Sequence, residues 1–146
     1  EAGVVHVTRH PLSGEAWLNG PVILSWADIH DAWPDDGVNV VIHESAHKLD
    51  MLNGDANGFP PLHDDMKRSD WAQVFPAAYD DFCAAVDKDP DAVAFDPYAA
   101  ESPGEFFAVF SEAFFEVPNR LRQWYPDMYE QLKRFYRQDP AARLPR

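Results

Sequence analysis

The stretch VVIHESAHKLD, residues 40–50, decides how the rest of the chain is interpreted. It contains His43 and His47 four residues apart, so on a helix their imidazoles lie one turn apart on the same face. Two imidazoles in that arrangement can bind one zinc ion, and Glu44 between them is placed to hold an attacking water. Residues 43–47 therefore predict both a zinc cofactor and a reaction, the hydrolysis of a peptide bond.

The residues around this motif predict that it lies on a helix. Apolar side chains precede and follow the histidines, and a helix is expected from about Asn39 to Leu52. Gly37 before it and Gly54 after it are residues typical of turns and helix ends. Exposed histidines on an amphipathic helix are the alternative, but paired histidines among so many apolar residues would be costly to bury without a ligand.

Length and composition indicate one globular domain. The chain has 146 residues, of which 46% are hydrophobic and 14% aromatic, enough for a single core but not for two. We expect one zincin-like metallopeptidase domain over residues 1–146, with residues 138–146 as a tail. The chain begins at Glu1 without a methionine, so we also expect it to be a domain excised from a longer protein.

Charge and cysteine content exclude some partners and predict a location. A formal net charge of −13 argues against nucleic acid as the main partner, because phosphate binding needs a basic surface. No stretch approaches the roughly 20 apolar residues of a membrane span, so no membrane partner is expected. Cys83 is the single cysteine and cannot form an internal disulfide, which fits a reducing compartment. We therefore expect a cytoplasmic protein.

The order of the predicted elements indicates the fold class. Strand-like patterns come first, at residues 4–8, 15–18 and 22–26, and helical patterns follow the motif helix at residues 69–87, 102–116 and 126–137. Strands followed by helices predict an α+β fold, here a small N-terminal β-sheet packed against the motif helix and further helices.

A catalytic zinc ion needs a third protein ligand, and the metzincin pattern does not supply it. That pattern requires a glycine three residues after the second histidine and a ligand six residues after it, but these positions hold Asp50 and Asn53. Asp50 follows His47 by one turn on the same face. A carboxylate there could accept the imidazole proton of a ligand histidine, and a hydrogen-bonding role at the helix end is the equal alternative.

Later glutamates remain candidates for the third ligand. Glu105, Glu112 and Glu116 recur at about helical spacing in a very apolar segment, where buried carboxylates need partners. Glu105 has a competing role, because Ser102 and Glu105 have the spacing of a capping box. The residues alone leave both Glu105 and Glu112 open.

Three longer stretches resemble the Mlc titration factor A family of zinc peptidases: residues 20–26, residues 43–54 and residues 98–116. The resemblance implies a gluzincin-like domain, related to the catalytic domain of anthrax lethal factor, with aminopeptidase-like activity. It implies Glu105 as the third zinc ligand and Tyr98 as an active-site tyrosine. On the same resemblance, we expect this chain to lack an amino-terminal part that the full-length family has.

The resulting hypothesis is a zinc-dependent peptidase acting on peptide substrates. His43, His47 and Glu105 hold one Zn²⁺ per chain, Glu44 acts as the general base, and Tyr98 donates to the developing oxyanion. The alternative is a regulatory binding module that docks a transcriptional repressor of the Mlc type. In that module the zinc site is structural or weakly active.

Overall fold

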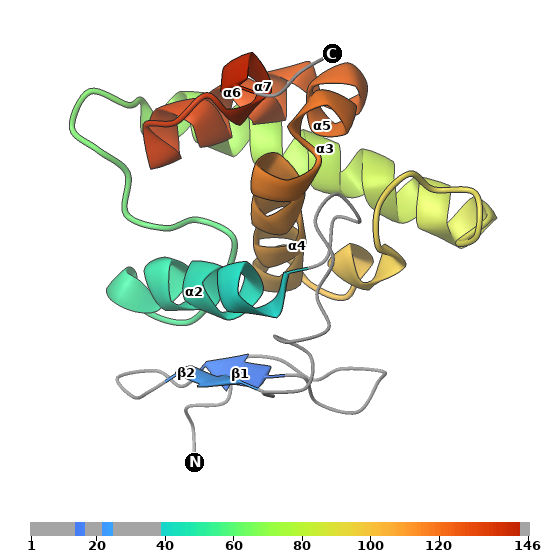
Figure 1. Cartoon of the computed structure of the whole chain (residues 1–146), viewed down its shortest axis with the longest axis horizontal. Helices are drawn as coiled ribbons and strands as arrows, with labels where there is room; N and C mark the ends of the chain where they lie inside the picture. The colour runs from blue at the N-terminus through green and yellow to red at the C-terminus, as the bar shows by residue number, and fades with distance from the viewer. Residues whose placement is uncertain (1–13, 17–21, 25–38, 144–146) are drawn as a thin grey trace.

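The computed structural model describes residues 14–16, 22–24 and 39–143 (Figure 1). A short hairpin comes first in this part of the chain, and helices make up most of the remainder. The elements in chain order are β1 (Gly14–Ala16), β2 (Val22–Leu24), α2 (Val40–Asp50), the 3-10 helix η1 (Met51–Asn53), α3 (Arg68–Lys88), the 3-10 helix η2 (Pro97–Ala100), α4 (Pro103–Glu116), α5 (Pro118–Trp124), α6 (Pro126–Tyr136) and α7 (Pro140–Arg143).

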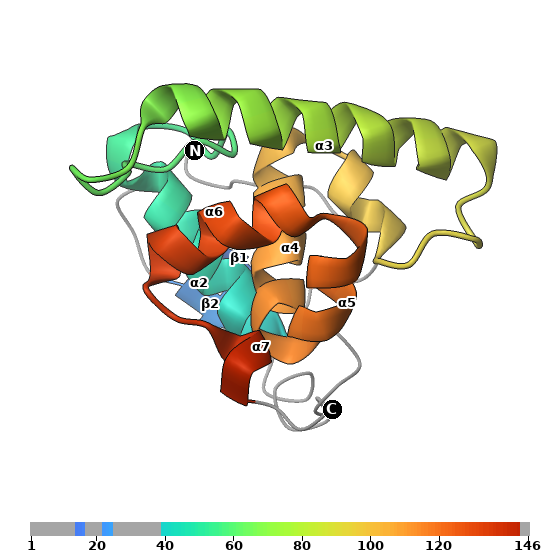
Figure 2. The same cartoon turned by 90° about the horizontal axis from the view of Figure 1, so that it is seen from above.

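Helix α4 is the centre of the fold. Figures 1 and 2 show it surrounded by α2 at one side and by α3, α5 and α6 at the other. Every residue from Gly104 to Phe114 is buried, so α4 has no solvent-facing stripe along most of its length. Its start is well defined, because Pro103 occupies the first turn and the Ser102 side chain accepts a hydrogen bond from the backbone of Glu105 at 3.1 Å.

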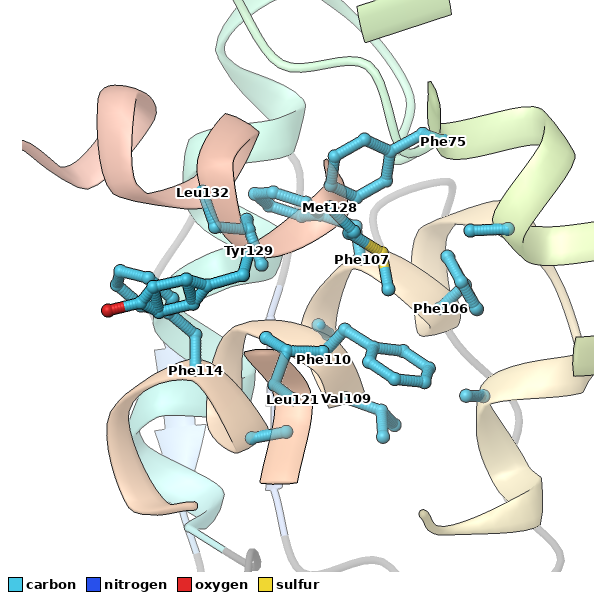
Figure 3. Packing of buried hydrophobic residues seen from close by; sticks show 14 of the residues in the cluster. Phe75, Phe106, Phe107, Val109, Phe110, Phe114, Leu121, Met128, Tyr129 and Leu132 are labelled. Atoms are coloured by element: carbon cyan, nitrogen blue, oxygen red, sulfur yellow. The ribbon is translucent and has the colours of Figure 1, made fainter. Parts of the chain in front are cut away.

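One side of α4 builds an aromatic core. Figure 3 shows its phenylalanines gathered against residues of α3 and α6, among them Phe75, Met128, Tyr129 and Leu132. Phe110 meets Phe82 of α3 edge to face, with ring centroids 5.4 Å apart. Such contacts hold α4 rigidly against the other helices.

Helix α2 lies between the hairpin and α4, in contact with both (Figure 1). Asn39 caps its start, since the Asn39 side chain accepts a hydrogen bond from Ile42 N at 3.1 Å. The helix ends in η1, and Gly54 follows with a φ of +135°. The predicted motif helix, Asn39 to Leu52, is therefore confirmed, with its last turn tightened into a 3-10 helix.

The prediction of an α+β fold with a small N-terminal β-sheet is wrong for the part of the chain that is described. The strands there form only a two-stranded antiparallel hairpin, with Glu15 opposite Ile23 and three residues in each strand. Strands this short bury too little surface to make a layer, and the core is built by helices instead. The expected strand at residues 4–8 lies outside the described residues.

The helices predicted at residues 69–87, 102–116 and 126–137 correspond to α3, α4 and α6. Two further helices were not predicted. Helix α5 begins at Pro118, because proline fits the first turn of a helix although it breaks a helix interior. Helix α7 lies in the expected tail, where Ala141 N donates to the buried Tyr129 side chain at 3.1 Å. Among the described helices, none combines the length and apolar character needed to cross a bilayer.

The helical core predicts how stability depends on two leucines. Leu132 of α6 is fully buried, whereas Leu52 is 71% exposed. Leu132→Ala should lower the free energy of unfolding by about 2–5 kcal/mol through lost burial and the cavity left behind. Leu52→Ala, the matched control, should change it by no more than about 0.5 kcal/mol. Urea unfolding followed by circular dichroism measures both, and equal effects would contradict the described packing.

Candidate metal centre

Helix α2 presents both motif histidines to α4. His47 is fully buried and His43 is 9% exposed, and their ring centroids are 4.8 Å apart at an interplanar angle of 81°. The spacing of four residues places the rings on one face, and the extensive contact between α2 and α4 covers that face. The predicted pairing of these imidazoles is thus present in the fold.

Glu105, in the first turn of α4, meets both histidines. Its Oε1 atom lies 2.9 Å from His43 Nε2 and 3.1 Å from His47 Nε2. The backbone N–H of Glu105 bonds to the Ser102 side chain, as expected for a capping box, whereas the Glu105 carboxylate lies against the two imidazoles. Of the two glutamates left open by the spacing, Glu105 is therefore the one that faces both histidines.

These three side chains fit a metal ion. One ligand atom from each of His43, His47 and Glu105 lies within 4.8 Å of the others. Ligands about 2.0–2.2 Å from a tetrahedral zinc ion lie roughly 3.4 Å from one another, close to the distances from Glu105 Oε1 to the two Nε2 atoms. Two imidazoles and one carboxylate also form a donor set typical of catalytic zinc, which leaves a fourth position for water or substrate.

Glu112 contacts the His43 ring on the side away from Glu105. Its Oε2 atom pairs with His43 Nδ1, the ring nitrogen opposite the one that faces Glu105, and its Oε1 accepts a hydrogen bond from Asn39 N at 2.8 Å. Asn39 also donates through its side chain to Glu116 Oε2 at 2.9 Å. A carboxylate on the second ring nitrogen fixes the tautomer and orientation of a ligand histidine.

Sequence reasoning considered Glu112 only as an alternative ligand. The signal for its observed position was present in the spacing: Glu112 follows Glu105 by seven residues, two helical turns, so both carboxylates share one face of α4. What the sequence did not provide was the crossing of α2 over that face, which places the His43 ring between the two carboxylates.

The buried charges perturb one another. Burial alone lowers the pKa of an imidazole, but the hydrogen bonds to Glu105 and Glu112 raise the pKa of His43 to about 10. For His47, burial prevails and the pKa is lowered. Burial raises the pKa of a carboxyl, yet the bonds from His43 and His47 lower the pKa of Glu105 to about 2. An anionic carboxylate between two imidazoles is stabilised by a positive charge, which either a bound proton or a metal ion can provide.

Tyr98 and Glu44 lie beside the same cluster. Tyr98, in η2, is buried, and its ring centroid is 6.4 Å from that of His43. Burial and the negative charges of Glu105, Glu101 and Glu44 all raise its pKa, which places these carboxylates near the phenol. Glu44 is also buried, at 2% exposure. The structure thus brings together five of the six predicted site residues.

Asp50, the sixth predicted site residue, is hydrogen-bonded to the loop that follows α2. It is fully buried at the end of α2, where its Oδ2 atom accepts from Gly58 N at 2.7 Å. Its expected role as acceptor for a ligand imidazole stays a prediction, whereas Glu112 makes such a contact with His43.

Comparison with known proteins agrees with this centre. Residues 1–137 match the family described as glucose-regulated metallo-peptidase M90. Proteins named Mlc titration factor A are similar over nearly the whole chain: 42% identity over 99% of the chain for Pectobacterium atrosepticum, and 44% over 100% for Yersinia enterocolitica. The chain spans about half of these curated relatives, 55% of each. The resemblance noted in the sequence is confirmed, and the chain belongs to the M90 metallo-peptidase family.

Proposed function

We propose that this chain carries the catalytic centre of a zinc-dependent peptidase. The observation that carries the proposal is the convergence of His43 Nε2, His47 Nε2 and Glu105 Oε1 from two helices onto one buried point. Membership of a metallo-peptidase family supports the same reading.

The three ligand residues and Glu112 have distinct tasks in this proposal. His43, His47 and Glu105 hold the ion, and Glu112 keeps His43 in the tautomer whose Nε2 faces the centre. When bound, zinc would polarise the scissile carbonyl and lower the pKa of a bound water toward about 7. Helix α2 supplies both imidazoles and α4 both carboxylates, so the geometry depends on how these helices cross.

Glu44 and Tyr98 would handle the proton and the developing charge. The Glu44 carboxylate takes a proton from the attacking water and later passes it to the leaving amine nitrogen. The Tyr98 hydroxyl donates a hydrogen bond to the carbonyl oxygen of the substrate as that oxygen gains charge. Burial raises the pKa of Tyr98 above its ordinary value, which supports a protonated phenol at neutral pH.

The type of peptide cleavage is proposed from the family resemblance. We extend the proposal to aminopeptidase-like cleavage of small peptides, and a cytoplasmic location stays a prediction. These extensions do not depend on the metal geometry.

A second candidate is a module that binds a transcriptional repressor of the Mlc type. The name of the relatives, Mlc titration factor A, is what favours it. Calorimetric titration of Mlc with the chain tests it. Equal binding by the parent and by Glu44→Gln, with no turnover in either, would favour this candidate over the enzyme.

Glu44→Gln tests the general base. The substitution keeps size and burial but removes the proton acceptor, so peptide hydrolysis should fall by about a hundredfold or more, while zinc content stays at one per chain. Glu130→Gln, on the exposed side of α6, is the control and should hydrolyse peptides at the parent rate. Parent-level cleavage by Glu44→Gln would remove Glu44 from the mechanism.

Glutamate substitutions in α4 test the metal set. Glu105→Ala should abolish stoichiometric zinc binding because it removes one of three ligands. Glu112→Gln should retain binding but weaken it by about 10–100-fold, since it loses the carboxylate behind His43. Competition with a chromophoric chelator measures both affinities. Parent-like affinity in Glu105→Ala would refute the ligand assignment.

A further inference from the structure

The loop after α2 returns to the metal centre at the start of α4. Two glycines show how close this approach is. A Cβ atom on Gly58 would lie 2.7 Å from the carbonyl oxygen of Pro103, and a Cβ atom on Gly104 would lie 2.8 Å from the carbonyl oxygen of Ala56. The backbones of residues 56–58 and 103–104 are therefore in direct contact, immediately before Glu105.

The loop is fixed on its other side by Asp50. The Asp50 carboxylate accepts from Gly58 N at 2.7 Å, while the Trp71 indole donates to Gly58 O at 2.9 Å. Both backbone polar groups of Gly58 are thus bound by buried side chains. The Gly58 φ of +79° is a conformation that a glycine adopts without steric cost.

A continuous chain of contacts results. It runs from Asp50, at the end of the helix that carries both histidines, through Gly58 to Pro103 and Gly104, and so to Glu105. We propose that Asp50, residues 56–58 and the Pro103-Gly104 pair form a clasp that positions Glu105 against His43 and His47. This inference rests on the proposed metal centre and makes Asp50 a positioning residue that acts through the loop.

The physical reason is the tolerance of metal coordination. Ligand distances are held within about 0.2 Å in a working site, but α2 and α4 belong to separate parts of the chain. The aromatic packing holds α4 against α3 and α6, so its position relative to the end of α2 depends on the contacts that α2 and the following loop make with α4. Direct contact between two backbones, with no side chain between them, resists movement of α4 relative to the loop more strongly than side-chain packing does. This contact involves Gly104, the residue next to Glu105.

Cobalt binding by the whole 146-residue chain tests the clasp without relying on activity. Co²⁺ is the probe, because its visible absorption reports the geometry of its ligands. Gly104→Ala introduces the Cβ clash although alanine is otherwise the better helix former, and Asp50→Asn weakens the anchor of Gly58 with little change in volume. Each should lower Co²⁺ affinity at least about tenfold and alter the absorption band, while far-ultraviolet circular dichroism shows a folded chain.

Matched controls lie in the same loop. Gly54→Ala strains the backbone, because the φ there is +135°, but its Cβ meets nothing within 4 Å, so it controls for loop strain without a clash. Asp55→Asn removes an exposed carboxylate five residues from Asp50. Both should bind Co²⁺ within about twofold of the parent. Parent-like affinity and spectra in Gly104→Ala and Asp50→Asn would overturn the clasp.

Hydrogen exchange on the unmodified chain covers the case in which both variants fail to fold. If the loop positions a ligand, metal binding must in turn stabilise the loop. Adding Co²⁺ should slow exchange at residues 56–59 together with residues 103–106, but not at residues 89–94. Unchanged exchange at residues 56–59, with protection gained only at the histidines, would overturn the proposal.

The two proposals can fail separately. A parent chain that binds Co²⁺ but cleaves no peptide would remove the proposed hydrolysis and leave the clasp to its own result. A parent chain that binds no Co²⁺ would overturn the metal centre, and the clasp with it.

Discussion

The fold depends on burying ionisable side chains between α2 and α4, beside the aromatic core. His43, His47, Glu105 and Glu112 are all buried, and each would be costly to desolvate alone. They are stable there because each meets an opposite partner: Glu105 faces both imidazoles, and Glu112 the far side of His43. Removing one partner leaves the others uncompensated, so the helices that carry them must stay in register.

Helix α4 meets this demand by serving two environments. Its phenylalanines pack against α3 and α6, as Figure 3 shows, while its glutamates face α2. The aromatic packing holds the helix in place, and the carboxylates bind the motif helix to it. Stability and the proposed chemistry thus share one element, which explains why a helix with three glutamates is buried over most of its length.

The sequence predicted the local features of this arrangement and missed those that depend on helix packing. The spacing of His43 and His47 sufficed to place both rings on one face, and turn residues marked the ends of α2. The glutamate spacing left Glu105 and Glu112 undecided, because the crossing of α2 and α4 assigns one to each side of His43. The fold class was wrong because β-branched residues at the start of the chain suggested a sheet, whereas in the described residues only three pair on each strand.

The proposed metal centre uses two imidazoles and one carboxylate as its ligands. X-ray diffraction from zinc-loaded crystals, measured on both sides of the zinc absorption edge, tests it most directly. We expect one anomalous peak bounded by His43 Nε2, His47 Nε2 and Glu105. A peak coordinated by Glu112 in place of Glu105, or a peak remote from the histidines, would contradict it.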